Sequence, residues 1–396
     1  MRVALNGWFW DQPTVGSGQY LRHLVEHLLR AAPAHTYHLV IPADPAELDF
    51  SLSSHDTPPA FHPVPLPFGK GNPRLRKLFF EQVAFPRACR ALGADVAHVP
   101  YWGSPLFSPC PVVVTIHDLI PLILPAYRSK WTMRWYVRLV GIAARRAAAV
   151  IAVSQATARD AARHLGIPAE RIHVIYEAAP PACRPITNPA LLEATRRKYA
   201  LPDRFFLYLG GFDVRKNVAV LLSAYARLLA AGAPDPPPLV IAGSLPDADT
   251  PFMPDPRAGA ARLGLAGHVH FPGRIDEADK PALYSLATAL IYPSRFEGFG
   301  LPPLEAMACG CPVIAADATS LPEVVGDAAI LVQPDNETGW AMALRRLLDG
   351  GERELWRQRG WAHAARFDWL HTAQETALLY TRIAQGYSGE KMLHFV

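Results

Sequence analysis

Short apolar runs alternate with longer amphipathic stretches along the first 186 residues. The first run is Val3–Leu5, and residues 20–29 then carry apolar side chains at helical spacing. The runs are apolar on both faces, which is typical of parallel strands covered by helices on each side. The predicted strands of this half are Val3–Leu5, Tyr37–Ile41, Val96–Val99, Val112–Ile116, Ala149–Val153 and Val174–Tyr176.

The same alternation begins again after a proline-rich segment, residues 180–203, which we interpret as a hinge. The predicted strands of this half are Phe205–Leu209, Leu239–Ala242, His268–Phe271, Ala289–Tyr292, Val313–Ala316 and Ala329–Val332. The predicted helices lie near 216–231, 279–287, 302–309 and 337–349, and a last helical block covers 352–385. The pattern therefore predicts an α/β chain with two doubly wound parallel-sheet domains, residues 1–186 and 187–370, followed by a terminal helix, 371–396.

The composition restricts the class of protein. Hydrophobic residues make up 50% and charged residues 19% of the 396 residues, which excludes a disordered chain. The longest apolar stretches, such as 111–116 and 147–153, are far shorter than the roughly 18 residues of a membrane span. Asp11 interrupts the amino-terminal segment, so we expect no secretion signal. The five cysteines form no Cys-x-x-Cys pair, which argues against zinc and favours a reducing cytoplasm.

The formal net charge of +4 conceals an asymmetry along the chain. Residues 1–186 carry 19 Lys and Arg against 12 Asp and Glu, so this half has a charge of +7 and the remainder −3. Basic and aromatic residues concentrate in two segments, 70–90 and 128–146. Such segments suit an anionic membrane surface, and equally a solvated face whose arginine stems cover the core edge. The basic side chains are Lys70, Arg74, Arg76, Lys77, Arg87 and Arg90, then Arg128, Lys130, Arg134, Arg138, Arg145 and Arg146. We expect no nucleic-acid partner, because no recognised binding module accompanies the charge.

The most informative stretch is residues 294–312, which follow the predicted strand Ala289–Tyr292 and enter a helix at Pro302. A turn that contains glycine and leads into a helix directs free backbone N–H groups at an anion. Glu297 and Glu305 are expected to flank this site and to accept hydrogen bonds from sugar or ribose hydroxyls. The alternative is that Glu297 is an ordinary turn residue and Glu305 an exposed helix position.

Other polar residues also follow predicted strands. Arg215 and Lys216 can neutralise a diphosphate, or they form a solvated pair on a loop. His117, beside Asp118, is either functional or a structural histidine. Asp247 and Asp249 spell Asp-x-Asp, a pattern that can hold a divalent cation, and we favour no metal there. Gly16-Ser17-Gly18 precedes a helix, and the absence of Gly-x-Gly-x-x-Gly argues against a dinucleotide dehydrogenase.

Taken together, these motifs resemble those of the retaining family-4 glycosyltransferases, which have the GT-B fold of two Rossmann-like domains facing across a cleft. The resemblance covers nearly the whole chain. The motifs that carry the resemblance are Phe296-Glu297-Gly298-Phe299-Gly300-Leu301 through Glu305, Thr115-Ile116-His117-Asp118-Leu119, Ile151-Ala152-Val153-Ser154, Gly210-Gly211 with Arg215-Lys216-Asn217, and Leu321-Pro322-Glu323. The common pattern has an Arg where this chain has Gly211, and Arg215 takes over that role.

The resemblance implies a metal-independent enzyme, without a cofactor, that moves a sugar from a nucleotide diphosphate to an acceptor hydroxyl with retention. The departing phosphate oxygen then takes the acceptor proton, so His117 positions a sugar hydroxyl or the phosphate instead of acting as a base. The implied catalytic residues are Glu297, His117, Arg215 and Lys216. The implied donor-binding residues are Gly16, Gly18, Gly211, Arg215, Lys216, Gly273, Arg274, Glu297, Phe299, Gly300, Leu301 and Glu305.

By the same resemblance, the first domain binds the acceptor, the second binds the donor, and the terminal helix returns to the first domain. The stretch from His117 to Leu122 is similar to that of mannosyltransferases in polysaccharide assembly, which favours GDP-mannose over a UDP-sugar. The expected acceptor is a glycan or a lipid-linked glycan, and the expected location is the cytoplasm, with the basic segments at the inner face of the membrane. The alternatives are a catalytically silent binding protein or a nucleotide-sugar epimerase of the same fold.

Overall fold

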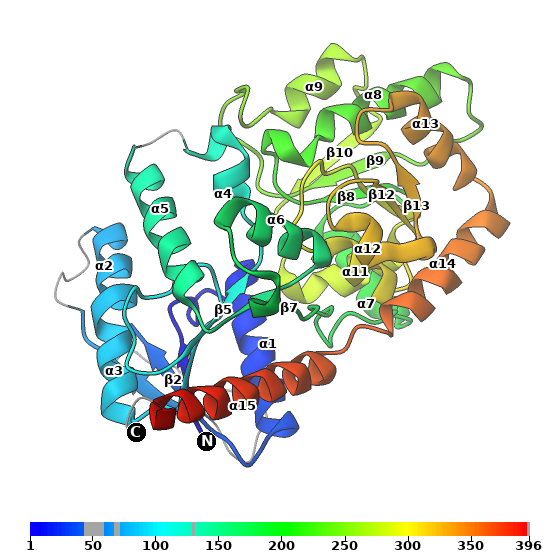
Figure 1. Ribbon diagram of the computed structural model, residues 1–396. Coiled ribbons are helices and arrows are strands. Elements are labelled where there is room, and N and C mark those ends of the chain that lie inside the picture. The colour runs from blue at the N-terminus through cyan, green and yellow to red at the C-terminus, as the bar shows by residue number, and fades with distance from the viewer. Residues whose placement is uncertain (43–58, 67–71, 129–130, 394–396) are drawn as a thin grey trace. The chain divides into compact units, whose positions relative to one another are not determined.

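The computed structural model describes residues 1–42, 59–66, 72–128 and 131–393 (Figure 1). The chain divides into two compact units. The first comprises Met1–Glu177 and Asp368–Val396, and the second comprises Ala178–Phe367. The chain therefore passes from one unit to the other twice, after Glu177 and after Phe367. The boundaries expected from the sequence, after residues 186 and 370, lie slightly further along the chain.

The first unit contains, among its described residues, a parallel sheet of seven strands in the order β3-β2-β1-β4-β5-β6-β7. The strands are β1 (Arg2–Asn6), β2 (Thr36–Ile41), β3 (Ala60–Pro63), β4 (Val96–Val99), β5 (Val112–Ile116), β6 (Ala149–Ala152) and β7 (Ile172–Val174). The predicted parallel sheet is confirmed, and β4, β5 and β6 are buried along their whole length. β3 has no predicted counterpart, because this short edge strand is largely half-buried and ends at Pro63. β7 begins two residues before the predicted strand, because Ile172 is already in register with Val150 of β6.

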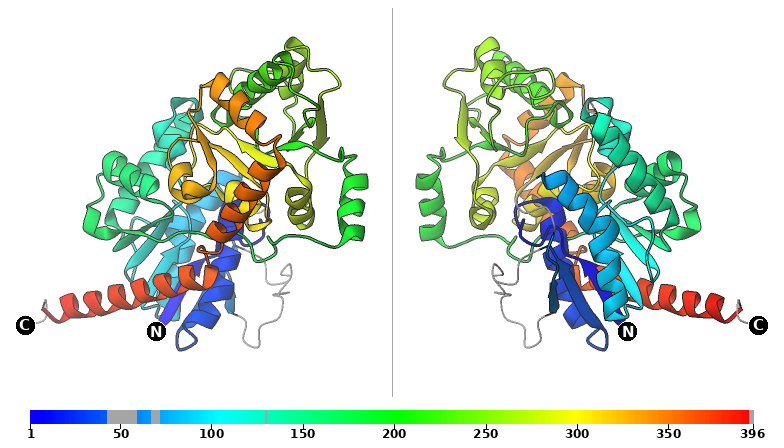
Figure 2. Two further views of the ribbon diagram at one scale, coloured as in Figure 1. Left: turned by 90° about the vertical axis from the view of Figure 1, so that its right-hand side faces the viewer. Right: turned by 90° about the vertical axis from the view of Figure 1, so that its left-hand side faces the viewer.

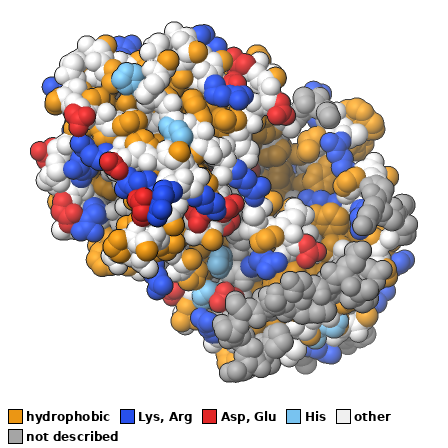
Figure 3. Space-filling model, turned by 180° about the vertical axis from the view of Figure 1, so that it is seen from behind, with side chains coloured by type: hydrophobic (Ala, Val, Ile, Leu, Met, Phe, Trp, Pro, Cys, Tyr) orange, Lys and Arg blue, Asp and Glu red, His pale blue; other side chains and the backbone are white. Residues whose placement is uncertain are grey.

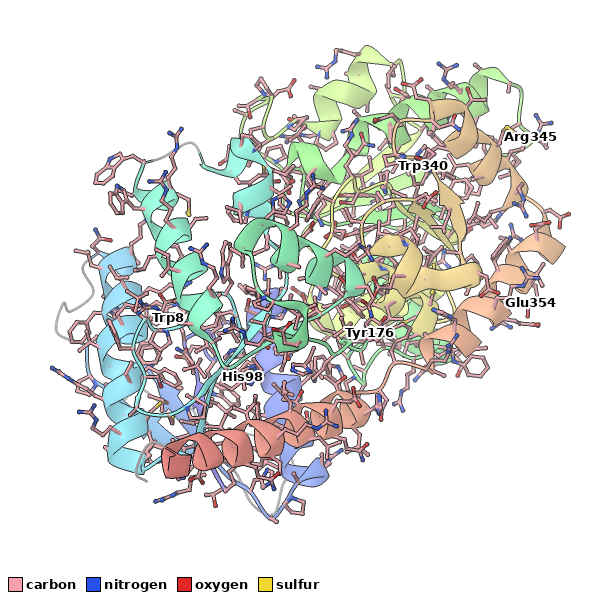
Figure 4. All side chains as sticks on the ribbon, in the orientation of Figure 1. Trp8, His98, Tyr176, Trp340, Arg345 and Glu354 are labelled. Atoms are coloured by element: carbon pink, nitrogen blue, oxygen red, sulfur yellow. The ribbon has the colours of Figure 1, made fainter. Side chains whose placement is uncertain are left out.

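Helices connect the strands of this sheet, and several of them pack against it. The helices of the first unit include α1 (Gly16–Ala31), α2 (Pro73–Phe79), a π-helical turn η2 (Phe80–Ala84), α3 (Phe85–Leu92), α4 (Ile120–Ile123), α5 (Trp131–Arg146), α6 (Gln155–Leu165) and α15 (Trp369–Leu393). Helix α15 packs against α1, and its carboxyl-terminal part projects beyond the rest of the first unit (Figure 2). Its Tyr380 hydroxyl lies 2.5 Å from Nδ1 of the buried His98, which Figure 4 labels, and its Thr372 hydroxyl donates to the carbonyl of Tyr176 at 2.7 Å.

The second unit, all of whose residues are described, contains a parallel sheet of six strands in the order β10-β9-β8-β11-β12-β13. The strands are β8 (Phe206–Leu209), β9 (Leu239–Ala242), β10 (Val269–Gly273), β11 (Ala289–Tyr292), β12 (Val313–Ala316) and β13 (Ile330–Val332). They match the six predicted strands to within two residues at either end. The four fully buried strands β8, β9, β11 and β12 form the centre of the unit's hydrophobic core.

The helices of the second unit are α7 (Pro189–Lys198), α8 (Val218–Ala230), α9 (Pro256–Arg262), α10 (Lys280–Leu286), α11 (Leu301–Ala308), α12 (Leu321–Val325), α13 (Glu337–Arg346) and α14 (Gly350–Ala364). Much of the segment interpreted as a hinge is helix α7, which Asn188 caps and which packs against α10. The predicted block 352–385 is two helices, α14 in the second unit and α15 in the first.

Both sheets reverse their strand order at one point. In the first sheet β1 lies between β2 and β4, and in the second sheet β8 lies between β9 and β11. Ligands of open parallel sheets bind beyond the carboxyl ends of the strands at such a reversal. The loops after β1 and β4, and those after β8 and β11, are therefore the places where a site is expected.

Candidate active site

Two loops of the second unit bring the predicted cations and Glu297 together at the strand reversal. Arg215 and Lys216 lie in the loop after β8, and Glu297 lies in the loop after β11. The Lys216 Nζ lies 2.6 Å from Oε1 of Glu297, and the Arg215 Nη1 lies 3.0 Å from Oε2. Each of the three side chains is 12% exposed. The alternative of a solvated Arg-Lys pair is therefore wrong, because both cations are largely buried and share one carboxylate.

Tyr292 and Asp213 complete this cluster, and neither was predicted from the sequence. Lys216 donates to the Tyr292 hydroxyl at 2.8 Å, and that hydroxyl donates to Oε1 of Glu297 at 3.1 Å. Oδ1 of Asp213 accepts from the backbone N–H of Arg215 at 3.2 Å and lies 3.3 Å from its Nε. A tyrosine that ends a buried strand was the available signal for Tyr292. Asp213 carries the usual signal of a capping residue, since it precedes a 3₁₀ turn.

The charges of the cluster determine the protonation state of Glu297. Burial alone raises the pKa of its carboxyl group, but Lys216 and Arg215 outweigh burial and hold the pKa below its ordinary value. Glu297 is therefore an ionised carboxylate at neutral pH. With Asp213, which lies 3.3 Å from the Arg215 Nε, the cluster contains two cations and two carboxylates, so their formal charges balance.

Strained backbone fixes the loop between Glu297 and helix α11. Thr319 adopts φ +50°, a conformation that β-branched residues rarely take, and its hydroxyl accepts from the backbone N–H of Glu297 at 3.0 Å. Gly300 adopts φ +125°, and a Cβ there would lie 2.9 Å from Leu321. The Ser320 hydroxyl donates to the carbonyls of Glu297 and Phe299, at 3.0 and 2.6 Å. These contacts hold Glu297 and the first turn of α11, which begins at Leu301, in fixed positions.

Glu305 lies elsewhere in the same unit. Its side chain is buried, so the alternative of an exposed helix position is wrong. Oε2 accepts a hydrogen bond from the Tyr284 hydroxyl at 2.9 Å. Burial raises the pKa of the Glu305 carboxyl group, although the nearby Lys280 and the Tyr284 hydrogen bond oppose that rise. Tyr284, its hydrogen-bond partner, is not a member of the Glu297 cluster.

The predicted glycines of the second unit differ in what they do. Gly211 is exposed, and its carbonyl accepts from the Tyr208 hydroxyl. Gly273 ends β10 with φ +79°, and its carbonyl accepts from the N–H of Gly243 at 2.8 Å. Arg274 beside it is exposed. Gly243, which was not predicted from the sequence, is more restricted than any of these, because a Cβ there would lie 2.1 Å from the carbonyl oxygen of Gly210.

The predicted residues of the first unit lie at or near the carboxyl edge of its sheet. Gly18 is required by packing, because a Cβ would lie 2.0 Å from the carbonyl oxygen of Gln12, whereas Gly16 has open space around it. His117 directly follows β5, and its Nδ1 lies 2.7 Å from Oε1 of Glu177. Its Nε2 lies 3.0 Å from the carbonyl oxygen of Pro100. Both ring nitrogens of His117 therefore contact acceptors of the protein itself.

Asp249 of the Asp-x-Asp pattern is engaged in local contacts. Its Oδ1 accepts from the backbone N–H of Asp255 at 2.9 Å, and its Oδ2 lies 3.2 Å from Arg262. Among the described residues, no group of three His, Cys, Asp or Glu side chains is arranged to hold a metal ion.

The second basic segment forms one exposed face of α5. Trp131, Arg134, Trp135 and Arg138 are exposed at helical spacing, while Val137 and Val140 are buried. By contrast, the part of the second unit visible in Figure 3 mixes Lys and Arg with Asp and Glu. Lys70, Lys130 and the side chain of Arg128 lie outside the described part of the chain. No helix of the described residues is both long and apolar enough to span a bilayer.

Two family descriptions match the chain. "Glycosyltransferase Family 4" matches residues 15–181, and "Glycosyl transferases group 1" matches residues 193–361. O-antigen chain mannosyltransferase B of Escherichia coli is 33% identical over 270 residues, which are 68% of this chain and 69% of that protein. The serotype-specific mannosyltransferase WbdA of Escherichia coli is 32% identical over 286 residues, 70% of this chain. This chain spans only 34% of WbdA.

The fold also matches that of solved structures. Sucrose-phosphate synthase from Thermosynechococcus elongatus superimposes with a TM-score of 0.75 at 23% identity, over 98% of this chain and 100% of that one. At this identity the likeness concerns the fold alone. It agrees with the family descriptions, and the GT-B fold expected from the sequence is confirmed.

Proposed function

Because the chain belongs to the group 1, family 4 glycosyltransferases, we propose that it transfers mannose from GDP-mannose to a hydroxyl of a growing polysaccharide. The names of its curated relatives, mannosyltransferases of O-antigen chains, support the sugar and the type of acceptor. The observation that carries the proposal is the cluster of Arg215, Lys216 and Glu297 at the strand reversal of the second unit.

In the proposed reaction Arg215 and Lys216 hold the donor diphosphate and neutralise the charge that develops as it leaves. The start of α11 adds positive potential through the N–H of Leu301 and the helix dipole, since Pro302 and Pro303 carry no N–H. Glu297 accepts a hydrogen bond from the transferred sugar, and Glu305, which Tyr284 holds in place, accepts one from the ribose. Gly211, Gly273 and Arg274 line the donor in this proposal, as do Phe299 and Gly300.

We propose that the reaction retains the anomeric configuration and needs no metal ion. The departing diphosphate oxygen takes the proton of the acceptor hydroxyl, so the protein supplies no general base. The geometry of His117 supports this point, because both of its ring nitrogens already contact Glu177 and Pro100. A nitrogen that donates to a protein acceptor cannot also take a proton from the acceptor sugar.

The test is transfer from GDP-mannose to a synthetic mannose oligosaccharide, with the new linkage identified by NMR. We expect an α-linked product from the α-linked donor, at the same rate in excess EDTA. The Lys216→Met variant should lose transfer by about a hundredfold or more, and Lys198→Met, an exposed lysine of the same unit, should retain it. A β-linked product would refute retention. Transfer only from a UDP-sugar would refute the donor, and loss in EDTA that Mn²⁺ reverses would point to Asp247 and Asp249.

We also propose that the exposed face of α5 contacts an anionic membrane surface that presents a lipid-linked acceptor. Trp131 and Trp135 are 71% and 65% exposed and one helical turn apart, with Arg134 and Arg138 on the same face. Tryptophan suits the lipid–water interface, and each arginine near anionic lipid contributes about 1 kcal/mol. No acidic residue occurs on this helix, so nothing on it repels such a surface.

Vesicle co-sedimentation tests this contact directly. Binding to vesicles with anionic lipid at low salt should fall about tenfold or more in Arg134→Gln/Arg138→Gln, since two charges near the surface are lost. The matched control Arg197→Gln/Arg204→Gln removes two exposed arginines from the second unit and should bind normally. Equal binding of both variants, or equal binding to neutral vesicles, would refute the membrane contact.

A further inference from the structure

His117 joins three segments at the carboxyl edge of the first sheet. The residue itself follows β5, its Nε2 partner Pro100 follows β4, and its Nδ1 partner Glu177 follows β7. Its backbone carbonyl accepts from the Thr157 hydroxyl of α6 at 3.2 Å. The ring of Tyr20, on α1, contacts the imidazole edge-on with centroids 4.8 Å apart. The position and the plane of the imidazole are thus fixed from several sides.

The chemistry of the two partners determines the protons on the ring. A backbone carbonyl can only accept, so the contact with Pro100 requires a proton on Nε2. A carboxylate also only accepts, so an ion pair between Glu177 and His117 places a proton on Nδ1. With both protons in place, His117 is an imidazolium cation paired with a carboxylate that is 3% exposed. A buried carboxylate of this kind is stable only with such a partner.

We propose that Glu177 is a positioning residue that keeps His117 doubly protonated, so that His117 acts as a fixed cation holding the loop after β4. This role goes beyond the sugar or phosphate contact expected for His117 from the sequence. Glu177 had no assigned role in the sequence analysis, since it lies in an ordinary coil after a short strand. It is also the last residue of the first unit before the chain crosses.

The surrounding charges agree with this assignment. Burial lowers the pKa of His117, but the charge and hydrogen bond of Glu177, the Pro100 carbonyl and Asp118 outweigh it, so the pKa lies above its ordinary value. The other titratable groups around the pair are Tyr20, His23 and His98. Burial lowers the pKa of His98 to about 3, with the charge of His117 as a further cause, so His98 stays neutral and does not compete for the proton.

The direct test is NMR of the full-length chain labelled with ¹⁵N-histidine, in which the His117 signals are identified by their loss in His117→Asn. We expect both ring nitrogens of His117 to be protonated at pH 7. In Glu177→Gln the midpoint of titration should fall by about one pH unit or more, a tenfold change in proton affinity. Glu170→Gln removes an exposed carboxylate of the same unit and should leave the midpoint unchanged. A neutral His117 at pH 6 in the parent chain would overturn the proposal, as would an unshifted midpoint in Glu177→Gln.

Two further measurements separate positioning from folding and from the proposed function. Glu177→Asp keeps the charge on a shorter side chain, so its titration midpoint should lie below that of the parent chain. This comparison does not depend on whether Glu177→Gln folds. The second measurement, an assay of KM, rests on the proposed mannosyl transfer. At pH 8 the KM for the acceptor should rise in Glu177→Gln by about tenfold, while the KM for the donor stays the same. An unchanged acceptor KM alongside a shifted NMR midpoint would refute the positioning role. Absence of transfer in the parent chain would refute the function and leave the NMR result standing.

Discussion

Replacing Glu297 by glutamine removes the one carboxylate that Arg215 and Lys216 share. The glutamine has the same shape, so the change leaves two largely buried cations with less compensation and makes no cavity. Removing one partner of a fully buried ion pair costs about 3–5 kcal/mol. Here Asp213 still contacts Arg215, and the Tyr292 hydroxyl still accepts from Lys216, so we expect about 2–4 kcal/mol.

Thermal unfolding measures this loss. For a unit of this size, about 2–4 kcal/mol corresponds to a fall of roughly 5–15 °C in the Tm of the second unit. The matched control is Glu337→Gln, which breaks an exposed pair with Arg227 in the same unit and should cost less than about 1 kcal/mol. The double variant Lys216→Met/Glu297→Gln should be more stable than the sum of the single changes predicts, because it leaves one cation fewer unpaired.

The pH dependence gives an independent check. The folded-state pKa of Glu297 lies below its ordinary value, so its contribution to stability is present above pH 4.5 and is lost as the pH falls through the folded-state pKa. The gap in Tm between the parent chain and Glu297→Gln should therefore narrow in acid. A Tm loss no larger than that of Glu337→Gln, strict additivity in the double variant, or a gap independent of pH would refute the reasoning.

Three further changes test other parts of the structure. Burial raises the pKa of Glu81 to about 7, so the stability that this group contributes is present below pH 4.5 and is lost as the pH rises through 7. Urea unfolding should show Glu81→Gln gaining up to about 3 kcal/mol on the parent chain between pH 4.5 and pH 8; parallel curves would contradict this. Gly18→Ala should destabilise by about 2 kcal/mol or more in the same assay, and Gly16→Ala by much less, because only Gly18 faces a backbone carbonyl; equal effects would be inconsistent with that clash. Tyr380→Phe should lose about 1–3 kcal/mol, because it leaves Nδ1 of the buried His98 without its hydroxyl partner; an unchanged Tm would contradict that cost.

The sequence predicts the strands well where burial dominates the pattern. Strands such as β5 and β11 are apolar at nearly every position because helices cover both of their faces, and a continuous apolar run of that length is recognisable. β3 escapes this pattern, since an edge strand with half-buried side chains carries little hydrophobic signal. Helix α7 was not predicted, because the prolines around it were interpreted as a hinge. Pro189 nevertheless lies at the first position of the helix, where proline favours helix formation.

The charged residues of the candidate site can be predicted from the sequence, but the residues that they contact cannot. The spacing of Glu297 and Lys216 from strand ends places both at one edge of the sheet. Tyr292, which bridges them, is 76 residues from Lys216 in the chain, and no local pattern indicates that its hydroxyl lies between the two. Glu177 is similarly 60 residues from His117. Such contacts depend on which strands are neighbours in the sheet, and the sequence alone did not establish that order.

The return of the chain to the first unit has a consequence for the order of synthesis. The ribosome completes residues 178–367 before it makes α15, so the second unit can fold while the first still lacks a helix. Until then His98 has no hydroxyl from Tyr380, and the carbonyl of Tyr176 lacks its bond from Thr372. The surface of α1 that α15 covers stays open to solvent for the same period. The unit made first is therefore completed last, and its final assembly waits until α15 has emerged from the ribosome.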